Sequence, residues 1–171
     1  ELIGKKIAAQ AAVVRDKLQL PQIAQEIART EARLDKAKTI EAVRNVEAQA
    51  ASAYWSAWKP SRIMFPRQDL ARVPEHWLTF GTRCSPLSGS PRSAVNPCNA
   101  ILNYLYALLE AEARLAAAEM GLDPGLGILH NDTTNRDSLA CDLMEPIRPH
   151  VDAYLFDWIS TQVLRREWFF E

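Results

Sequence analysis

The chain has 171 residues, 24% of them charged, and a formal net charge of −1 at pH 7. This length is enough for one domain with its own hydrophobic core, and the near-neutral charge by itself indicates no nucleic-acid partner. No run of about 18 apolar residues occurs, so the sequence predicts no membrane span. The three cysteines form no CxxC pair and fit free thiols in a reducing compartment better than a disulfide framework or a structural zinc site.

Helical periodicity dominates the first third of the chain. Apolar residues recur every three or four positions in residues 3–18, 23–34 and 43–58, which predicts three amphipathic helices. Pro21 suits the first turn of the second helix, and Thr39 is a good N-cap for the third. No segment shows the alternation of a β-strand, so the predicted fold class is all-α.

Residues 59–95 break this periodicity. They are rich in Pro, Gly, Ser and Arg, which predicts a long irregular segment. Between residues 59 and 92, six basic residues face only two acidic ones. A local excess of positive charge suits contacts with a DNA backbone, although a solvated loop surface explains the same charges without any ligand. The candidate DNA-binding residues are Lys59, Arg62, Arg67, Arg72, Arg83 and Arg92.

The last third of the chain returns to helical patterns. Asn96 and Pro97 are the expected N-cap and first residue of a long helix. A shorter helix should begin near residue 137, and Pro146 predicts a kink in it because proline has no N–H to donate. A final helix is expected over residues 151–159. The predicted organisation is therefore one helical domain over residues 1–171, with helices in 1–58, an irregular basic segment in 59–95, and helices carrying a metal site in 96–171.

Four residues in these helices and turns are candidates for chemistry. Glu47 lies among apolar positions of its helix, where a carboxylate is costly unless it is paired or bound to a metal. His130 follows an apolar pair in a turn, and Asp142 and Glu145 lie three residues apart on one helix face. Carboxylates and an imidazole that meet in space form the donor set of a metal-dependent phosphoryl-transfer site.

Each candidate also has a purely structural explanation. Glu47 at a helix edge can pair with Arg44, which lies three residues before it. A lone histidine in a turn is more often a hydrogen-bonded structural residue than a ligand. The two later carboxylates can be exposed acids whose charge is offset by Arg136 or Arg148.

Three parts of the sequence together resemble one protein family. They are VRNVEAQAASAYW at residues 43–55, NPCNAILNYLYALL at residues 96–109, and the pair formed by residues 121–130 and DSLACDLMEP at residues 137–146. Their order and spacing are similar to the C-terminal helical domain of the CRISPR-associated endonuclease/integrase, the larger of the two core spacer-acquisition proteins. The likeness covers almost all of the chain and implies that a small β-domain normally precedes it.

The resemblance also implies a site. Glu47, His130 and Glu145 would hold Mg²⁺ or Mn²⁺, and Asp142 would be a catalytic residue beside them. Two positions depart from the family pattern: Ala48 stands where the family often has Gly, and Glu145 stands where many members have Asp. Both departures are mild, because alanine is well tolerated in a helix and Glu keeps the oxygen ligand.

The activity implied by the resemblance is that of a metal-dependent DNA endonuclease/integrase of a prokaryotic cytoplasm. The 3′-OH of a captured DNA fragment would attack a phosphodiester at the edge of a CRISPR repeat and so insert a new spacer. The implied partners are double-stranded DNA (the spacer precursor and the CRISPR repeat), a second copy of the protein in a homodimer, and the small second subunit of the spacer-acquisition complex. Two alternatives remain open: a transposon-type integrase of the same family, and a catalytically silent DNA-binding scaffold.

Overall fold

The computed structural model describes residues 1–83, 93–130 and 137–168, and within these ranges the chain is helical without a β-strand. The predicted all-α fold class is confirmed. None of the described helices combines the length and the apolar character that crossing a membrane requires. The α-helices are α1 (Leu2–Asp16), α2 (Pro21–Glu31), α3 (Ile40–Trp58), α4 (Pro97–Glu119), α5 (Ser138–Met144) and α6 (Arg148–Thr161), and the short 3-10 helices are η1 (Leu34–Lys36), η2 (Glu75–Trp77) and η3 (Arg166–Trp168).

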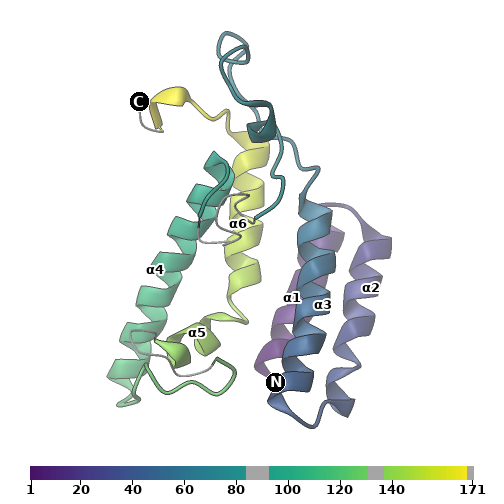
Figure 1. Ribbon diagram of the computed structural model, residues 1–171, viewed down its shortest axis with the longest axis vertical. Helices are drawn as coiled ribbons and strands as arrows, with labels where there is room; N and C mark the ends of the chain where they lie inside the picture. Colours follow the sequence, from purple (N-terminus) through teal and green to yellow (C-terminus); the bar gives the residue numbers. More distant parts are fainter. Residues whose placement is uncertain (84–92, 131–136, 169–171) are drawn as a thin grey trace.

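The helices form two groups (Figure 1). Helices α1, α2 and α3 pack against one another, and α4 packs against α5 and α6. Helix α1 also packs against α6, so it connects the two groups. The short helix α5 lies at the lower end of the view, beside α4, and this end of the molecule is where the candidate site residues meet.

The two predicted N-caps are confirmed. The side chain of Thr39 accepts a hydrogen bond from the backbone N–H of Ala42 at 3.1 Å. Asn96 accepts one from the N–H of Asn99 at 2.8 Å and donates from its own amide nitrogen to the carbonyl of Phe80 at 2.7 Å. The second contact matters most, because it fixes the end of the irregular segment to the start of α4.

Two expected helices differ from the prediction. Helix α2 ends at Glu31, and Leu34 reaches the core from the tighter turn of η1 instead of continuing the helix. The predicted kink at Pro146 is a full break, since α5 ends at Met144 and α6 begins at Arg148. Proline removes one helical hydrogen bond and collides with the preceding turn, which is enough to end so short a helix.

Aromatic side chains form the centre of the core. Tyr54, Trp58 and Phe80 are fully buried. The ring of Trp58 lies 5.0 Å from that of Phe80 and 5.5 Å from that of Phe156 on α6, measured between centroids. Trp58 therefore joins α3, the irregular segment and α6. Cys98 and Cys141 are free, as predicted, and both are buried, whereas Cys84 lies outside the described residues.

A carboxyl group is buried in this core. Asp152 on α6 is 1% exposed and accepts hydrogen bonds from the hydroxyls of Tyr54, at 2.8 Å, and Tyr106, at 2.5 Å. Burial raises the pKa of Asp152 to about 6, even though both tyrosines and the nearby Arg83 and Arg148 act to lower it. The carboxyl therefore takes up a proton more readily in the folded protein than in the unfolded chain.

This raised pKa predicts a pH-dependent stability. The stabilising contribution of protonated Asp152 is complete below about pH 4 and is lost as pH rises through about 6, because the unfolded chain then binds fewer protons than the native state. Between pH 4 and pH 7 the wild type should lose about 2 kcal/mol of unfolding free energy relative to Asp152→Asn, which cannot ionise. Urea unfolding at several pH values measures this difference. The exposed Asp157→Asn variant on the same helix is the control, and parallel curves for wild type and Asp152→Asn would contradict the prediction.

Candidate active site

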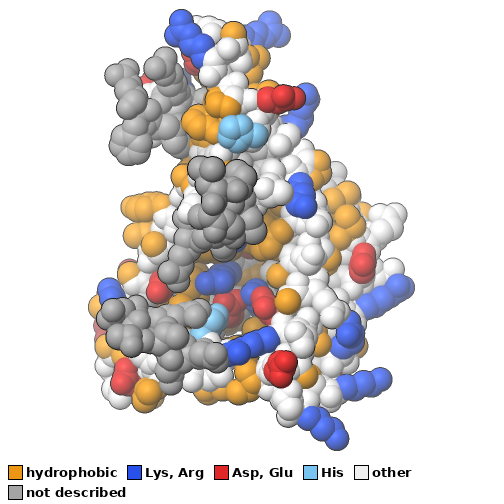
Figure 2. Space-filling model, viewed as in Figure 1, with side chains coloured by type: hydrophobic (Ala, Val, Ile, Leu, Met, Phe, Trp, Pro, Cys, Tyr) orange, Lys and Arg blue, Asp and Glu red, His pale blue; other side chains and the backbone are white. Residues whose placement is uncertain are grey.

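A cleft of about 450 Å³ lies between α1, α3 and the segment that leads into and out of α5. Figure 2 shows a hollow in the lower part of this face in which acidic, basic and histidine side chains gather. Glu47, His130 and Glu145, three of the four residues proposed from the sequence, line the cleft. Residues that are 83 positions apart in the chain, such as Glu47 and His130, thus share one cavity.

A lysine occupies the centre of this arrangement. Lys6 on α1 is 6% exposed, and its Nζ lies 2.5 Å from Oε1 of Glu47 and 2.5 Å from Oε2 of Glu145. Glu145 is also paired with Arg148, whose Nη1 lies 3.0 Å from Oε1. Two carboxylates repel each other when close, so the ammonium is what allows α3 and the end of α5 to bring them together.

Asp142 and His130 form the second part of the site. Oδ2 of Asp142 accepts hydrogen bonds from the backbone N–H groups of Ile128, at 2.6 Å, and Leu129, at 2.8 Å. Oδ1 accepts one from the N–H of His130 at 3.1 Å and lies 2.6 Å from its ring Nδ1. An ionised carboxylate only accepts, so Nδ1 carries the proton. In the neutral form of the ring Nε2 is then the nitrogen with a lone pair, and it lies 3.9 Å from Oε1 of Glu145.

The ionisation of Asp142 follows from these contacts. Burial alone would raise its pKa, but the backbone hydrogen bonds from Ile128 and Leu129, followed by the ring of His130, hold the pKa below its ordinary value. Asp142 therefore stays charged and orients the imidazole. A carboxylate behind a histidine, on the side away from the cleft, is the usual support of a metal-binding histidine.

The loop that carries His130 is fixed from two sides. A Cβ at Gly127 would lie 2.6 Å from the Cβ of Ser138, so only glycine permits this close approach to the start of α5. On the other side, Nε of Arg44 donates to the carbonyl of Leu129 at 2.7 Å. Arg44 lies on α3 three residues before Glu47. One helix thus presents a carboxylate to the cleft and holds the histidine loop in place.

The structure brings all three proposed metal ligands, Glu47, His130 and Glu145, to one cleft, but it does not arrange them as a metal site. Among the described residues, no three His, Cys, Asp or Glu side chains are arranged so that they could hold a metal ion. The ammonium of Lys6 stands between Glu47 and Glu145 instead. The proposed offset of Glu145 by Arg148 is observed, and it coexists with the position of both residues at the cleft.

The residues that the sequence analysis missed are cations. Lys6 was not considered, although it lies between the apolar residues Ile3 and Ile7 on the buried face of α1. A lysine in such a position needs a carboxylate partner, and Glu47 on the apolar face of its helix needs a cation. The sequence could therefore have suggested that the two residues pair. Arg148 was considered only as a charge that offsets surface acids.

The irregular basic segment separates into exposed and packed residues. Arg83 is half-buried, with its guanidinium 4.5 Å from the ring centroid of Trp55 and 5.3 Å from that of Tyr106, and it donates to Asn103 at 3.1 Å. The guanidinium of Arg83 therefore packs between residues of α3 and α4. Arg92 lies outside the described residues. The remaining four candidates are exposed: Lys59, Arg62, Arg67 and Arg72.

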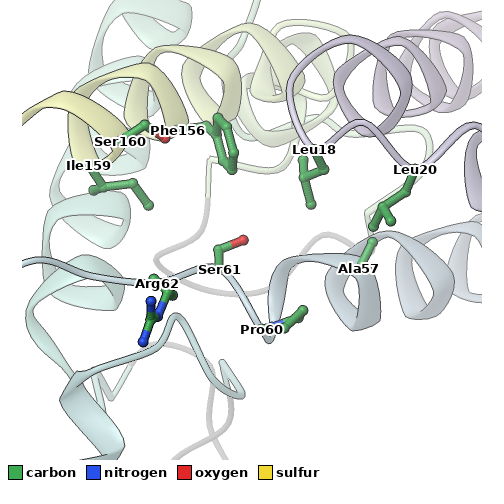
Figure 3. Close-up of a pocket in the computed structure, with 9 residues that line it drawn as sticks. All are labelled: Leu18, Leu20, Ala57, Pro60, Ser61, Arg62, Phe156, Ile159 and Ser160. Carbon is green, nitrogen blue, oxygen red and sulfur yellow. The ribbon is translucent and has the colours of Figure 1, made fainter.

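A second, smaller cavity of about 280 Å³ lies between the connection from α1 to α2, the end of α3 and helix α6. Figure 3 shows the residues that line it, including Leu18, Leu20, Phe156 and Ile159. Its described lining contains one charged side chain, that of Arg62, and no carboxylate or histidine. The cleft around Lys6 is therefore the better candidate for chemistry.

Comparison with known proteins agrees with this geometry. A family model described as "CRISPR associated protein Cas1" matches residues 1–171. The chain is 37% identical over 124 residues to "CRISPR-associated endonuclease Cas1 2" of Rhodospirillum rubrum, a match that covers 72% of this chain and 32% of that protein. It is 32% identical over 186 residues to "CRISPR-associated endonuclease Cas1 1" of Archaeoglobus fulgidus, covering 98% of this chain and 50% of that protein. The chain thus spans half the length or less of these two relatives.

Solved structures show the same fold. A chain in the structure titled "Casposase bound to integration product" superposes with a TM-score of 0.72 at 28% identity, covering 94% of this chain and 44% of that one. A Cas1 protein from Thermotoga maritima has a TM-score of 0.68 at 21% identity and covers 99% of this chain and 51% of that one. With a family model matched from the first residue to the last, the chain belongs to the Cas1 family of CRISPR-associated proteins.

Proposed function

We propose that this chain is the catalytic helical part of a metal-dependent DNA endonuclease/integrase, which joins the 3′-OH end of a DNA fragment to a CRISPR repeat. The observation that carries the proposal is the convergence of Glu47, Glu145 and the Nε2 atom of His130 on one cleft, with Asp142 fixing the imidazole from behind. Family membership and the nuclease names of the curated relatives support it.

The residues of the cleft fit a divalent ion in two respects. The donors are two carboxylates and one imidazole nitrogen, which is a set that Mg²⁺ or Mn²⁺ accepts. The two carboxylates are also already gathered around a positive charge, that of Lys6. Glu47, Glu145 and His130 would therefore hold the metal, and Asp142 would support His130 without binding the metal itself.

A bound metal would polarise the scissile phosphate and offset the charge on the leaving oxygen. The other contributions come from the side chains of this chain. Asp142 keeps the proton of His130 on Nδ1 and so keeps Nε2 directed at the cleft. Arg148 holds the carboxylate of Glu145 in place through its 3.0 Å ion pair, and its guanidinium is braced 5.0 Å from the ring of Tyr106. The reaction needs no covalent protein intermediate, because the attacking group belongs to the DNA.

The proposed partners are double-stranded DNA, a second copy of the protein and a small second subunit. Among the structural neighbours, one is a casposase bound to an integration product and another is a Cas6-RT-Cas1–Cas2 complex. The second of these shares 20% identity with this chain and supports only the fold. The casposase neighbour favours a second candidate, a transposon-type integrase with the same chemistry and a different DNA target.

A strand-transfer assay on the full-length protein tests the proposed function. Fragments with a free 3′-OH should become joined to a repeat-containing plasmid in Mg²⁺ or Mn²⁺, and not in EDTA. Joining to plasmids that lack the repeat but carry a transposon target would favour the transposon-type alternative. DNA binding without joining in any metal would identify a silent scaffold and contradict the proposal.

The exposed basic residues of the irregular segment give a separate prediction for DNA affinity. Neutralising Arg62, Arg67 and Arg72 together should weaken binding to all DNA sequences alike, because contacts with phosphates carry no sequence preference. The slope of log affinity against log salt should fall by roughly 0.9 for each contact that is lost with duplex DNA. Arg15→Gln, on α1 and paired with Asp16, is the control. An unchanged slope in the triple variant would show that DNA is held elsewhere.

A further inference from the structure

Lys6 is the most unusual charged residue of the cleft. It projects from the buried face of α1, and its side chain is 7% exposed. Its Nζ lies at the same distance, 2.5 Å, from one oxygen of Glu47 and one oxygen of Glu145. A buried lysine is stable only when carboxylates match its charge. Relative to these two side chains, the ammonium takes the position that a bound cation requires.

The local charges are already balanced in this state. Glu47 is matched by Lys6, and Glu145 is matched by Lys6 and by Arg148, whose Nη1 lies 3.0 Å away. A divalent ion that binds both Glu47 and Glu145 would use the two carboxylate groups that the ammonium now contacts, and metal–oxygen bonds are only about 2.0–2.6 Å long. Two cations cannot lie so close to the same pair of carboxylates without strong mutual repulsion.

Lysine is well suited to leave such a position. Its charge is carried at the end of a flexible four-carbon chain, so the ammonium can move several ångströms without a change in the helix. The cleft of about 450 Å³ in front of Glu47 offers space for that movement. The carboxylate of Glu145, in contrast, is also held by its 3.0 Å ion pair with Arg148.

We infer that Lys6 is a built-in competitor of the metal. In the metal-free protein its ammonium holds Glu47 and Glu145 together, and binding of a divalent ion displaces it from both carboxylates. Lys6 thereby sets how much free metal is needed to load the site. This inference rests on the proposed function, because it assumes that the two carboxylates belong to a metal site.

Calorimetric titration of Mn²⁺ into the full chain at constant pH is the first test. Lys6→Met, which keeps an unbranched apolar side chain and removes the ammonium, should bind Mn²⁺ at least about tenfold more tightly than the wild type. Lys5→Met is the matched control, since Lys5 is its exposed neighbour and pairs with Glu1. Without metal, Lys6→Met should melt at a lower temperature, and Mn²⁺ should raise its Tm by more than it raises that of the wild type. Equal or weaker Mn²⁺ binding by Lys6→Met would overturn the inference.

A second measurement uses the wild type, so it stands even if Lys6→Met does not fold. Acetylation by a water-soluble acyl ester, followed by mass spectrometry, reports the accessibility of each lysine amine. Saturating Mg²⁺ should raise the acetylation rate of Lys6 severalfold and leave that of Lys5 unchanged. A Lys6 rate that is unchanged or lower in Mg²⁺ would overturn the displacement.

The Glu47→Gln variant separates this inference from the proposed function. If the wild type binds Mn²⁺, Glu47→Gln does not, and Lys6→Met binds like the wild type, then Lys6 is not a competitor and the metal site stands. If neither the wild type nor any variant binds Mn²⁺, the inference about Lys6 and the proposed function are both wrong. If Lys6→Met binds more tightly but the metal-loaded protein joins no DNA, the competition by Lys6 is correct and the integrase function is not.

Discussion

Replacing Glu47 with glutamine is expected to lower metal-dependent strand transfer by about a thousandfold, the scale on which loss of one preorganised electrostatic group reduces catalysis. The side chain of Glu47 is 26% exposed at the cleft and contacts Lys6, so its neutral analogue should leave the helix and its packing intact. Joining rates in Mg²⁺ and Mn²⁺, measured together with circular dichroism and the melting temperature, separate loss of chemistry from loss of fold.

The control for this variant lies on the same helix. Glu41 is an exposed residue of the first turn of α3, and Glu41→Gln should join DNA at the wild-type rate. A Glu47→Gln protein that retains more than about a tenth of wild-type activity would show that Glu47 serves only as the ion-pair partner of Lys6.

Replacing Asp142 with alanine is expected to be the most destabilising single change in the site. Asp142 accepts hydrogen bonds from three consecutive backbone N–H groups, those of residues 128–130, and from the ring of His130. Alanine leaves all of these donors without their acceptor, and breaking a buried charged network of this kind costs about 3–5 kcal/mol. Urea unfolding measures the loss, and strand transfer should fall as well because the histidine loses its orientation.

His130→Ala separates the two roles of Asp142. It keeps the backbone hydrogen bonds to the carboxylate and removes only the imidazole, so stability should change by less than about 1 kcal/mol while strand transfer is abolished. The reverse pattern, with a stable Asp142→Ala and an unstable His130→Ala, would mean that the loop is held by the imidazole and not by the carboxylate.

Local signals were sufficient to predict most helices of this fold. The caps at Thr39 and Asn96 act through backbone groups three residues away, and the apolar periodicity of α3 and α4 spans several turns. The boundary at Pro146 was located correctly, but its effect was underestimated, since a helix of seven residues cannot absorb a proline as a kink. The residues against which 59–83 pack were not predictable, because they include aromatic side chains that are distant in the sequence, such as Trp58 beside Phe80.

The candidate site was only partly predictable for the same reason. Glu47 and Glu145 were identified because carboxylates at apolar or paired positions are visible in one sequence. The contacts of Lys6 and Asp152 join residues 41 or more positions apart. The sequence around each residue therefore does not indicate which residue is its partner. Asp142 was expected beside the metal, and its hydrogen bonds to the backbone of residues 128–130 depend on how the loop folds back on α5.

The division of the site between the two helical groups has a consequence for the cell that makes the protein. Lys6 and Glu47 are synthesised before His130, which is 83 residues further along the chain than Glu47. A nascent chain that has only α1–α3 contains Glu47 paired with Lys6 but lacks His130 and Glu145, so it cannot assemble the proposed site. The proposed metal site therefore forms only when the last helices have docked against α1 and α3.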